Sequence, residues 1–417
     1  MTQAMEITAA VLFALALVHT FSCAVFERLA QRHPRHAGLL RLLGEVEVVF
    51  GFWAIVLVVL MALVAGPSDA IAYAESRQYT EPLFVFVIMV VAASRPVVDV
   101  IESLVARLAG WLPRHAALAR IWLCLALLPL VGSLVTEPAA MTLAALMLRP
   151  TVFRPGIPEW LKYAALGVLF VNVSVGGTLT AFAAPPVLMV ADAWNWDSAF
   201  MARTFGVKAV FAVLVNASAV CYLLRRHAVP EDTVPRSQDT ERVPLVVCVV
   251  HLLFLAGVVA FAHHPVMFLG LFLLFLGYTQ AYARYQNPLV LKEALLVGFF
   301  LAGLVVLGGQ QQWWLQPLVS GLQPLALFFG ALGLTAFTDN AALTYLGTLI
   351  DGLDESSRYM LVAGAVAGGG LTVIANAPNP AGVSLLKQGF ADGSIGALGL
   401  LLGAALPTAV AAALFLL

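Results

Sequence analysis

Apolar segments long enough to cross a lipid bilayer recur along almost the whole of this chain. A membrane-spanning helix needs about 20 apolar residues, and the stretches 5–26, 44–65 and 203–224 are examples. Of the 417 residues, 61% are hydrophobic and only 11% are charged, which is too little charge to cover the surface of a water-soluble domain. Short segments of alternating polarity, the pattern of a membrane β-barrel, are missing from the sequence. We therefore expect an all-α protein that crosses the membrane many times.

The hydropathy pattern predicts ten crossings and two re-entrant hairpins. The expected crossings are 5–26, 44–65, 82–106, 160–192, 203–224, 244–262, 265–283, 289–308, 358–390 and 396–417. The hairpins are expected at 119–149 and 315–350, where the arm after each turn has about a dozen residues and is too short to span. Within 160–192 and 358–390 the stretches NVSVGGTLTAFAAPP and AGGGLTVIANAPNP contain Gly and Pro, which interrupt helices. Both of these crossings should therefore be broken.

The basic residues are distributed unevenly between alternate loops. In this layout, the loops on one side of the membrane hold all but four of the 22 Lys and Arg residues, the exceptions being Arg77, Arg203, Lys208 and Arg358. Cytoplasmic loops are enriched in Lys and Arg, so the basic side is predicted to be cytoplasmic. Both termini then lie on the outer side, and residues 225–243 form a cytoplasmic linker. We expect an integral protein of a bacterial inner membrane.

The second half of the chain repeats the first. The motif SLVTEPAAMT (133–142) aligns with TAFTDNAALT (335–344), and GGTLTAFAAPP (176–186) aligns with GGLTVIANAP (369–378). Residues 1–224 and 244–417 each contain three helices, a hairpin, a broken helix and a last helix. Five crossings are an odd number, so the second repeat should be inverted relative to the first. Inverted repeats with discontinuous helices are typical of secondary transporters, which bind their substrate where the breaks meet.

Two acidic residues, Glu137 and Asp339, occupy equivalent positions at the predicted hairpin turns. A carboxylate at the centre of a bilayer costs about 2.5–3.5 kcal/mol on insertion scales, which favours a functional role over a hydrogen bond that only supports the turn. Two neighbouring carboxylates in a low dielectric do not readily ionise together. A proton and a sodium ion are therefore expected to compete for the same oxygens.

The remaining candidate ligands are hydroxyl groups, amides and loop carbonyls close to the turns and the breaks. They are Ser133, Thr136, Thr335, Thr338, Asn340, Asn172, Gly177, Thr178, Gly370, Thr372 and Asn376. Such an oxygen-rich site suits a small hard cation such as Na⁺, and no clustered Cys or His favours a softer metal. The hydroxyl groups have an alternative role, because Ser and Thr often bond a carbonyl within their own helix.

At these residues the chain resembles the ion transporter superfamily, in which each inverted half carries a re-entrant hairpin and a broken helix. It is most similar to the sodium/proton antiporters of that superfamily. In the dicarboxylate branch the hairpin tips typically read Ser-Asn-Thr, whereas here they read Thr136-Glu137-Pro138 and Thr338-Asp339-Asn340. Two acidic tips would repel a carboxylate substrate. The resemblance also implies a homodimer and an elevator-like movement of a domain that carries the hairpins.

The function predicted from the sequence is the exchange of Na⁺, or a similar small cation, for H⁺ by alternating access, with no cofactor. A Na⁺-coupled transporter of organic anions or oxyanions from the same superfamily is the alternative within transport. An intramembrane enzyme is disfavoured because HExxH and GxSxG motifs are missing, and broken inverted repeats favour a transporter over a channel. No basic cluster with interleaved aromatic residues suggests a nucleic-acid partner. The expected partners are the bilayer, a small cation and a second copy of the chain.

The charge distribution gives a test of the topology. A cysteine introduced within 225–243 should react with a membrane-impermeant thiol reagent only from the cytoplasmic side, and one within 351–357 only from the outer side. Labelling of right-side-out and inverted vesicles checks both positions. Reaction of both cysteines from the same side would overturn the inverted-repeat topology.

Overall fold

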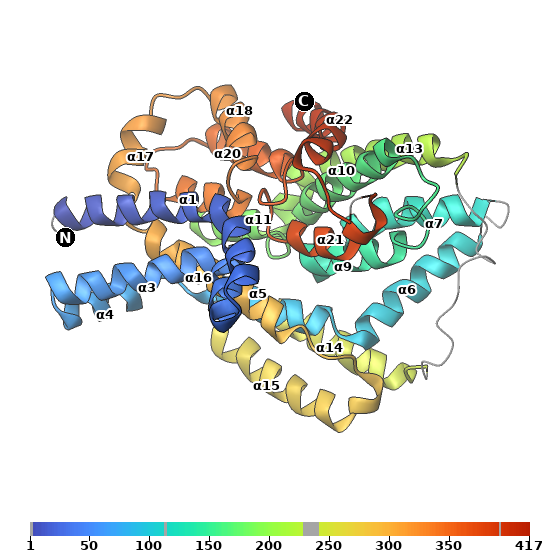
Figure 1. Ribbon diagram of the computed structural model, residues 1–417, viewed down its shortest axis with the longest axis horizontal. Coiled ribbons are helices and arrows are strands. Elements are labelled where there is room, and N and C mark those ends of the chain that lie inside the picture. The colour runs from blue at the N-terminus through green and yellow to red at the C-terminus, as the bar shows by residue number, and fades with distance from the viewer. Residues whose placement is uncertain (1–2, 112–114, 228–241, 392) are drawn as a thin grey trace.

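The computed structural model describes residues 3–111, 115–227, 242–391 and 393–417, and every regular element within these ranges is helical (Figure 1). Six helices are long and apolar enough to cross a membrane, or up to eight when each of two bent pairs is counted as one span. The expectation of an all-α polytopic membrane protein is therefore confirmed. Most of the predicted linker 225–243 lies outside the described residues.

Within the described residues, the first half contains thirteen α-helices and several shorter helical turns. The α-helices are α1 (Gln3–Arg32), α2 (Ala37–Leu43), α3 (Val46–Val64), α4 (Pro67–Glu75), α5 (Thr80–Ala92), α6 (Arg95–Gly110), α7 (Ala116–Leu125), α8 (Leu127–Val135), α9 (Glu137–Leu148), α10 (Glu159–Gly176), α11 (Pro185–Trp194), α12 (Ser198–Met201) and α13 (Val207–Leu224).

The second half contains nine α-helices among the described residues. Its α-helices are α14 (Leu245–Ala260), α15 (Pro265–Ala281), α16 (Leu291–Gly308), α17 (Gln312–Val319), α18 (Pro324–Thr335), α19 (Asn340–Thr348), α20 (Glu355–Gly368), α21 (Asn379–Leu386) and α22 (Ala397–Leu416).

The two expected helix breaks are present. Helix α10 ends at Gly176 and the chain resumes as α11 at Pro185, while α20 ends at Gly368 and α21 begins at Asn379. These ends coincide with the Gly-rich stretches. Glycine has the lowest helix propensity of all residues except proline, and proline cannot continue the backbone hydrogen bonding of a preceding helix. The breaks leave the peptide groups between the helices available for other contacts.

The segment 82–106, expected as one crossing, is bent rather than a single straight helix. Helices α5 and α6 meet at an angle of 64°, and Ser94 between them has an extended backbone with ψ 142°. The cause is Pro96 in the first turn of α6, because proline has no N–H to donate to the carbonyl of Ala92 and its ring would collide with that carbonyl. The chain therefore stops α5 at Ala92 and starts a new helix.

The hairpins and the broken helices of the two halves pack against one another. Within each half, the arm that enters the turn packs on the first part of the broken helix, α8 on α10 and α18 on α20. The arms that leave the turns cross over between the halves, because α9 packs on α21 and α19 packs on α11. Helices α10 and α20 also contact each other. Both turns and both breaks are thereby gathered in the interior.

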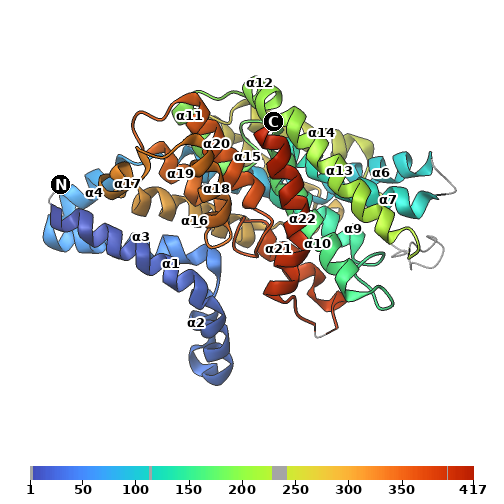
Figure 2. The same cartoon turned by 90° about the horizontal axis from the view of Figure 1, so that it is seen from above.

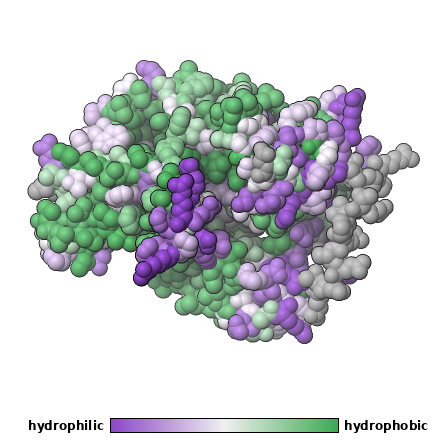
Figure 3. Space-filling model, viewed as in Figure 1, coloured by the Kyte–Doolittle hydropathy of each residue, from purple (hydrophilic) through white to green (hydrophobic). Residues whose placement is uncertain are grey.

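A second group of helices lies beside this assembly. Helices α1, α3, α5 and α16 pack together on the side of the molecule that carries the N-terminus, and α2 projects away from the remainder (Figure 2). Hydrophilic surface covers the end of α1 and α2, next to hydrophobic surface over α3 and α4 (Figure 3). Exposed Val11 on α1 and Val59 and Leu63 on α3 suit contact with lipid tails.

Small residues allow α10 and α22 to approach until their backbones touch. A Cβ atom added to Gly167 would lie 2.3 Å from the backbone of Gly403, and one added to Gly403 would lie 2.2 Å from the carbonyl oxygen of Tyr163. Membrane helices often use small residues at such contacts, because packing rather than burial from water holds them together. Neither glycine can be enlarged unless the two helices separate.

We expect Gly403→Ala to destabilise the protein by about 1–3 kcal/mol, the usual cost of overpacking a close contact. Gly277→Ala in α15 is the matched control, since nothing lies within 4 Å of a Cβ atom at that position and alanine is the better helix former. Unfolding midpoints of both purified variants in detergent check the prediction. Equal midpoints would show that the α10–α22 contact does not limit stability.

Candidate functional site

The turn between α8 and α9 is held in an unusual backbone conformation. Thr136 has φ 144° and ψ 155°, a region that residues with a side chain rarely adopt and that costs of order 1–3 kcal/mol. Its hydroxyl caps α9 by accepting a hydrogen bond from the Ala139 amide at 3.5 Å. The next residue, Glu137, begins α9, so the strained turn fixes where its side chain starts.

Glu137 is completely buried and reaches the break of the other half. Its Oε2 accepts a hydrogen bond of 2.7 Å from Nδ2 of Asn376, in the segment between α20 and α21. Its Oε1 has no hydrogen-bond partner among the described residues. A Cβ atom on Gly177 would lie 2.4 Å from this oxygen, so only glycine fits beside the carboxylate. The sequence prediction that Glu137 and Asn376 lie near each other agrees with this geometry.

Asp339 occupies a different environment at the second turn. It precedes α19, and its Oδ1 accepts hydrogen bonds from the amides of Ala341 (2.8 Å) and Ala342 (3.4 Å). A carboxylate in this position caps the helix and interacts favourably with its dipole. The side chain is 9% exposed and lines a small cavity. Asp339 therefore caps the helix that follows it, whereas Glu137 bonds Asn376 in the other half.

Asn340 and Ser174 join the second turn to both breaks. The backbone amide of Asn340 donates to the Ala375 carbonyl at 3.0 Å, and its side-chain Nδ2 donates to Oγ of Ser174 at 3.4 Å. Ser174 in turn donates to the Val366 carbonyl at 2.9 Å. Gly369 lies against this contact, because a Cβ there would come within 2.2 Å of the Ser174 hydroxyl oxygen.

Hydroxyl groups tie each turn to the break in its own half. In the first half, Ser133 donates to the Gly176 carbonyl at 2.6 Å and accepts from the Leu179 amide at 2.9 Å, while Thr180 donates to the Ser133 carbonyl at 2.6 Å. In the second half, Thr372 donates to the Ala336 carbonyl at 3.0 Å. Ser133 and Thr372 thus lie at the site as the sequence predicted.

Other predicted ligands are placed nearby with their hydroxyl groups already used. Thr335 donates to the Ala331 carbonyl and Thr178 to the Val175 carbonyl, both within the same stretch of chain, which is the common behaviour of hydroxyls in helices. Thr338 lines the cavity beside Asp339. Gly370 packs on α10, where an added Cβ would lie 2.5 Å from the Val171 nitrogen.

Four buried side-chain oxygens at the turns and breaks have no hydrogen-bond partner among the described residues. They are Glu137 Oε1, Asn340 Oδ1, Asn376 Oδ1 and Asn379 Oδ1. The amide nitrogens of the same three asparagines are all used, since Asn379 Nδ2 donates to the carbonyls of Gly369 and Thr372. Leaving such groups unpaired costs about 1–3 kcal/mol each. The site therefore presents acceptors without donors.

A metal held here would be bound mainly by neutral oxygens. Among the described residues there is no group of three or more His, Cys, Asp or Glu side chains that could hold a metal ion. Carboxylate, amide and backbone carbonyl oxygens are the ligands of hard cations. The arrangement suits a singly charged ion beside one carboxylate better than a transition metal.

Asn172 lies in a separate polar cluster away from the turns. Its Nδ2 donates to the carbonyls of Leu125 (2.8 Å) and Val213 (3.1 Å), and its Oδ1 accepts from Asn216 at 3.0 Å. The Leu125 carbonyl is available because Pro129, four residues later, has no N–H to donate to it. Asn172 thus compensates for a proline in the first hairpin and connects α10 to neighbouring helices.

Sequence reasoning did not single out Ser174, Asn379 or Glu47. Ser174 and Asn379 flank the breaks, so their proximity to the Gly-rich motifs was a usable signal. Glu47, in the first turn of α3, lines the cavity with Asp339. The sequence carried no indication of this contact, because α3 and α19 are far apart along the chain.

Two turns and two helix breaks bring a buried carboxylate together with amide oxygens that have no donor among the described residues, and interrupted helices around a polar site are typical of membrane transporters. The chain belongs to the family described as “Putative Na+/H+ antiporter”, which matches residues 4–417. Among curated proteins, none matches this chain. The sequence-based assignment to the sodium/proton antiporters is confirmed.

The polar cluster around Asn172 gives a prediction about stability. Asn172→Ala and Asn216→Ala should each lower the unfolding midpoint, because each substitution leaves buried polar groups without a hydrogen-bond partner. A double-mutant cycle should give a coupling of about 0.6–1.7 kcal/mol, the range for hydrogen bonds between membrane helices. Thr408→Val is the control, since the buried Thr408 hydroxyl has no partner among the described residues. A coupling energy near zero would contradict this structural role of Asn172.

Proposed function

We propose that this protein exchanges Na⁺, or a similar small cation, for H⁺ by alternating access, with Glu137 and Asp339 at the hairpin turns as ligands. The observation that carries the proposal is the polarity of the site. The side-chain nitrogens of three asparagines donate hydrogen bonds to protein acceptors, and their side-chain oxygens have no partner among the described residues. The three are Asn340, Asn376 and Asn379. Such a site attracts a cation and offers nothing to an anion.

Glu137 supplies the coupling between the two ions. A buried carboxylate without a counter-charge is expensive, so this residue favours states in which either H⁺ or Na⁺ neutralises it. The neutral hydrogen bond from Asn376 cannot replace that charge. The site can then move across the membrane when it holds either H⁺ or Na⁺, but not when it is empty and charged. This is the condition for tightly coupled exchange.

The lengths of the hairpin arms support re-entrant hairpins and inverted repeats. Helix α9 has 12 residues and α19 has 9, which correspond to roughly 18 and 14 Å at 1.5 Å per residue. A bilayer core is about 30 Å thick, so neither arm spans it. With five crossings before and five after residues 225–243, the two halves would be inverted, and both termini would lie outside. A homodimer and an elevator-like movement remain predictions from the family resemblance.

A Na⁺-coupled carrier of organic anions or oxyanions is the second candidate, because the resemblance extends to a superfamily with a dicarboxylate branch. The two candidates differ in what stabilises the purified protein. A ligand at 100 times its dissociation constant adds about 2.7 kcal/mol of stability. The cation proposal expects Na⁺ alone to raise the unfolding midpoint over a choline reference, with no further rise from dicarboxylate, phosphate or sulfate.

Charge-neutral variants of the two acidic residues test the ligand assignment. Asp339→Asn should fold, since asparagine also caps a helix N-terminus well, and should abolish coupled exchange because an amide neither titrates nor balances Na⁺. Glu137→Gln should abolish exchange or strongly shift its pH dependence. The exposed Glu355→Gln is the control and should behave as wild type.

The measurement is Na⁺-driven proton flux in reconstituted vesicles at matched protein levels. Near wild-type flux with Asp339→Asn would reduce that residue to a helix cap. Near wild-type flux with both acidic variants would show that neither residue is a ligand and would contradict the proposed site.

A further inference from the structure

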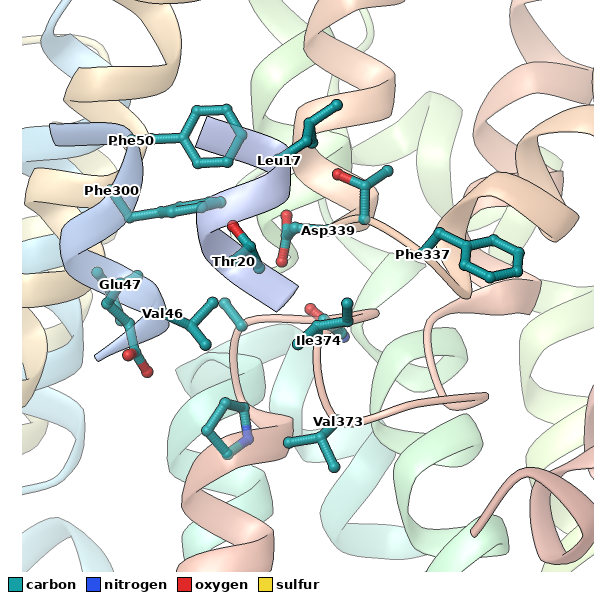
Figure 4. Close-up of a pocket in the computed structure, with 15 residues that line it drawn as sticks. Leu17, Thr20, Val46, Glu47, Phe50, Phe300, Phe337, Asp339, Val373 and Ile374 are labelled. Atoms are coloured by element: carbon teal, nitrogen blue, oxygen red, sulfur yellow. The ribbon is translucent and has the colours of Figure 1, made fainter. Parts of the chain in front are cut away.

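A small cavity lies between the hairpin of the second half and the helices α1, α3 and α16. It has a volume of about 20 Å³, enough for a single water molecule or small ion. Glu47 of α3, Thr20 of α1 and Asp339 share its lining, and Thr20 lies between the two acidic residues (Figure 4). Two elements that belong to different packing groups therefore face each other across this space.

The cavity also reaches the proposed ion site. Asn376 contributes to its lining, is 1% exposed and has an Oδ1 atom without a hydrogen-bond partner among the described residues. The same side chain donates its Nδ2 hydrogen to Glu137. Glu47, Thr20, Asp339 and Asn376 thus line one cavity, and Asn376 connects it to Glu137.

Exposure falls along this series. Glu47 is partly exposed, Asp339 is 9% exposed, and Glu137 is fully buried. Of the charged residues close to Glu47 in the sequence and the fold, Lys292 forms its ion pair with Glu45 at 2.9 Å, and Glu293 is exposed. Glu47 is therefore the more exposed of the two acidic residues that line the cavity.

The position of Glu47 in α3 does not account for this placement. An acidic residue in the first turn interacts favourably with the helix dipole, and Glu47 is the acidic residue in the first turn of α3, whereas Glu45 at the N-cap makes no capping hydrogen bond with its side chain. The dipole does not require a carboxylate to line a cavity beside a second carboxylate, where mutual repulsion raises the free energy of both. A cation between them removes the repulsion.

We propose that Glu47 is the entry ligand of the cation pathway, receiving Na⁺ at the mouth of the cavity and passing it beside Thr20 to Asp339. This inference rests on the exchange function proposed above and adds to it a residue outside the repeated motifs. The mouth lies near the basic connection between α1 and α3, so the entry is on the cytoplasmic side in the predicted topology. A negative charge at a narrow opening raises the local concentration of cations and their rate of entry.

Removing the charge should weaken Na⁺ capture more than turnover. For Glu47→Gln we expect the apparent KM for Na⁺ in vesicle exchange to rise about five- to tenfold, with maximal exchange within about twofold of wild type. Glu47→Asp, which retains the charge, should restore most of the affinity. Glu293→Gln removes an exposed charge from the first turn of α16 without touching the cavity lining and should leave the KM unchanged.

A second measurement is independent of exchange. The native cysteines Cys23, Cys124, Cys221 and Cys248 are all buried and can be replaced by alanine before Glu47→Cys is introduced. We expect a charged, membrane-impermeant thiol reagent to modify this cysteine from the cytoplasmic side, and Na⁺ but not choline to slow the reaction. Adding Asp339→Asn should abolish the Na⁺ protection, because the ion is then no longer held in the cavity.

The outcomes separate the two proposals. Absence of Na⁺-driven proton flux in the wild-type protein overturns the exchange function, whatever Glu47 does. Flux in the wild type together with an unchanged KM in Glu47→Gln overturns the entry role alone. If Glu47→Gln does not fold, labelling decides the question, and a Glu47→Cys variant that reacts equally fast with and without Na⁺ overturns the inference.

Discussion

The hydrogen bond from Asn376 to Glu137 is the contact on which the organisation of this protein depends. It joins the first hairpin to the break of the second half at 2.7 Å, and both partners are almost completely buried. The bond requires the helix after Gly368 to stop, because an asparagine within a continuous helix could not reach across to α9. It also requires Gly177, since any side chain there would occupy the space of the carboxylate.

The two hairpin turns are similar in sequence position and different in chemistry. Glu137 holds one oxygen toward Asn376 and has a second oxygen without a donor. Asp339 uses one oxygen to cap α19 and lines a cavity shared with α1 and α3. The deeper residue suits the selection between H⁺ and Na⁺, whereas the other suits exchange with the solution. The proposed exchange thus assigns two distinct environments to the two acidic ligands.

Interrupted helices are costly in a membrane, because a freed peptide group has no water to bond. In this chain, polar side chains donate hydrogen bonds to carbonyls that the interruptions free. Asn172 bonds the Leu125 carbonyl freed by Pro129, Ser133 bonds the Gly176 carbonyl at the first break, and Asn379 bonds the Gly369 carbonyl at the second. At the turns and breaks, four buried side-chain oxygens are left without a donor among the described residues, on Glu137, Asn340, Asn376 and Asn379.

The sequence alone determined the class of protein and both helix breaks, and it pointed to the turns and breaks where Glu137, Asp339, Ser133, Asn340, Thr372 and Asn376 lie. These follow from local rules, because hydropathy sets helix length and Gly and Pro set where helices end. The bend at Ser94, the removal of Asn172 to a separate cluster and the presence of Glu47 beside Asp339 were decided by the tertiary structure. Each depends on which helices lie next to one another, and that choice is made by close packing between residues distant in the chain, such as the backbone contact of Gly167 with Gly403.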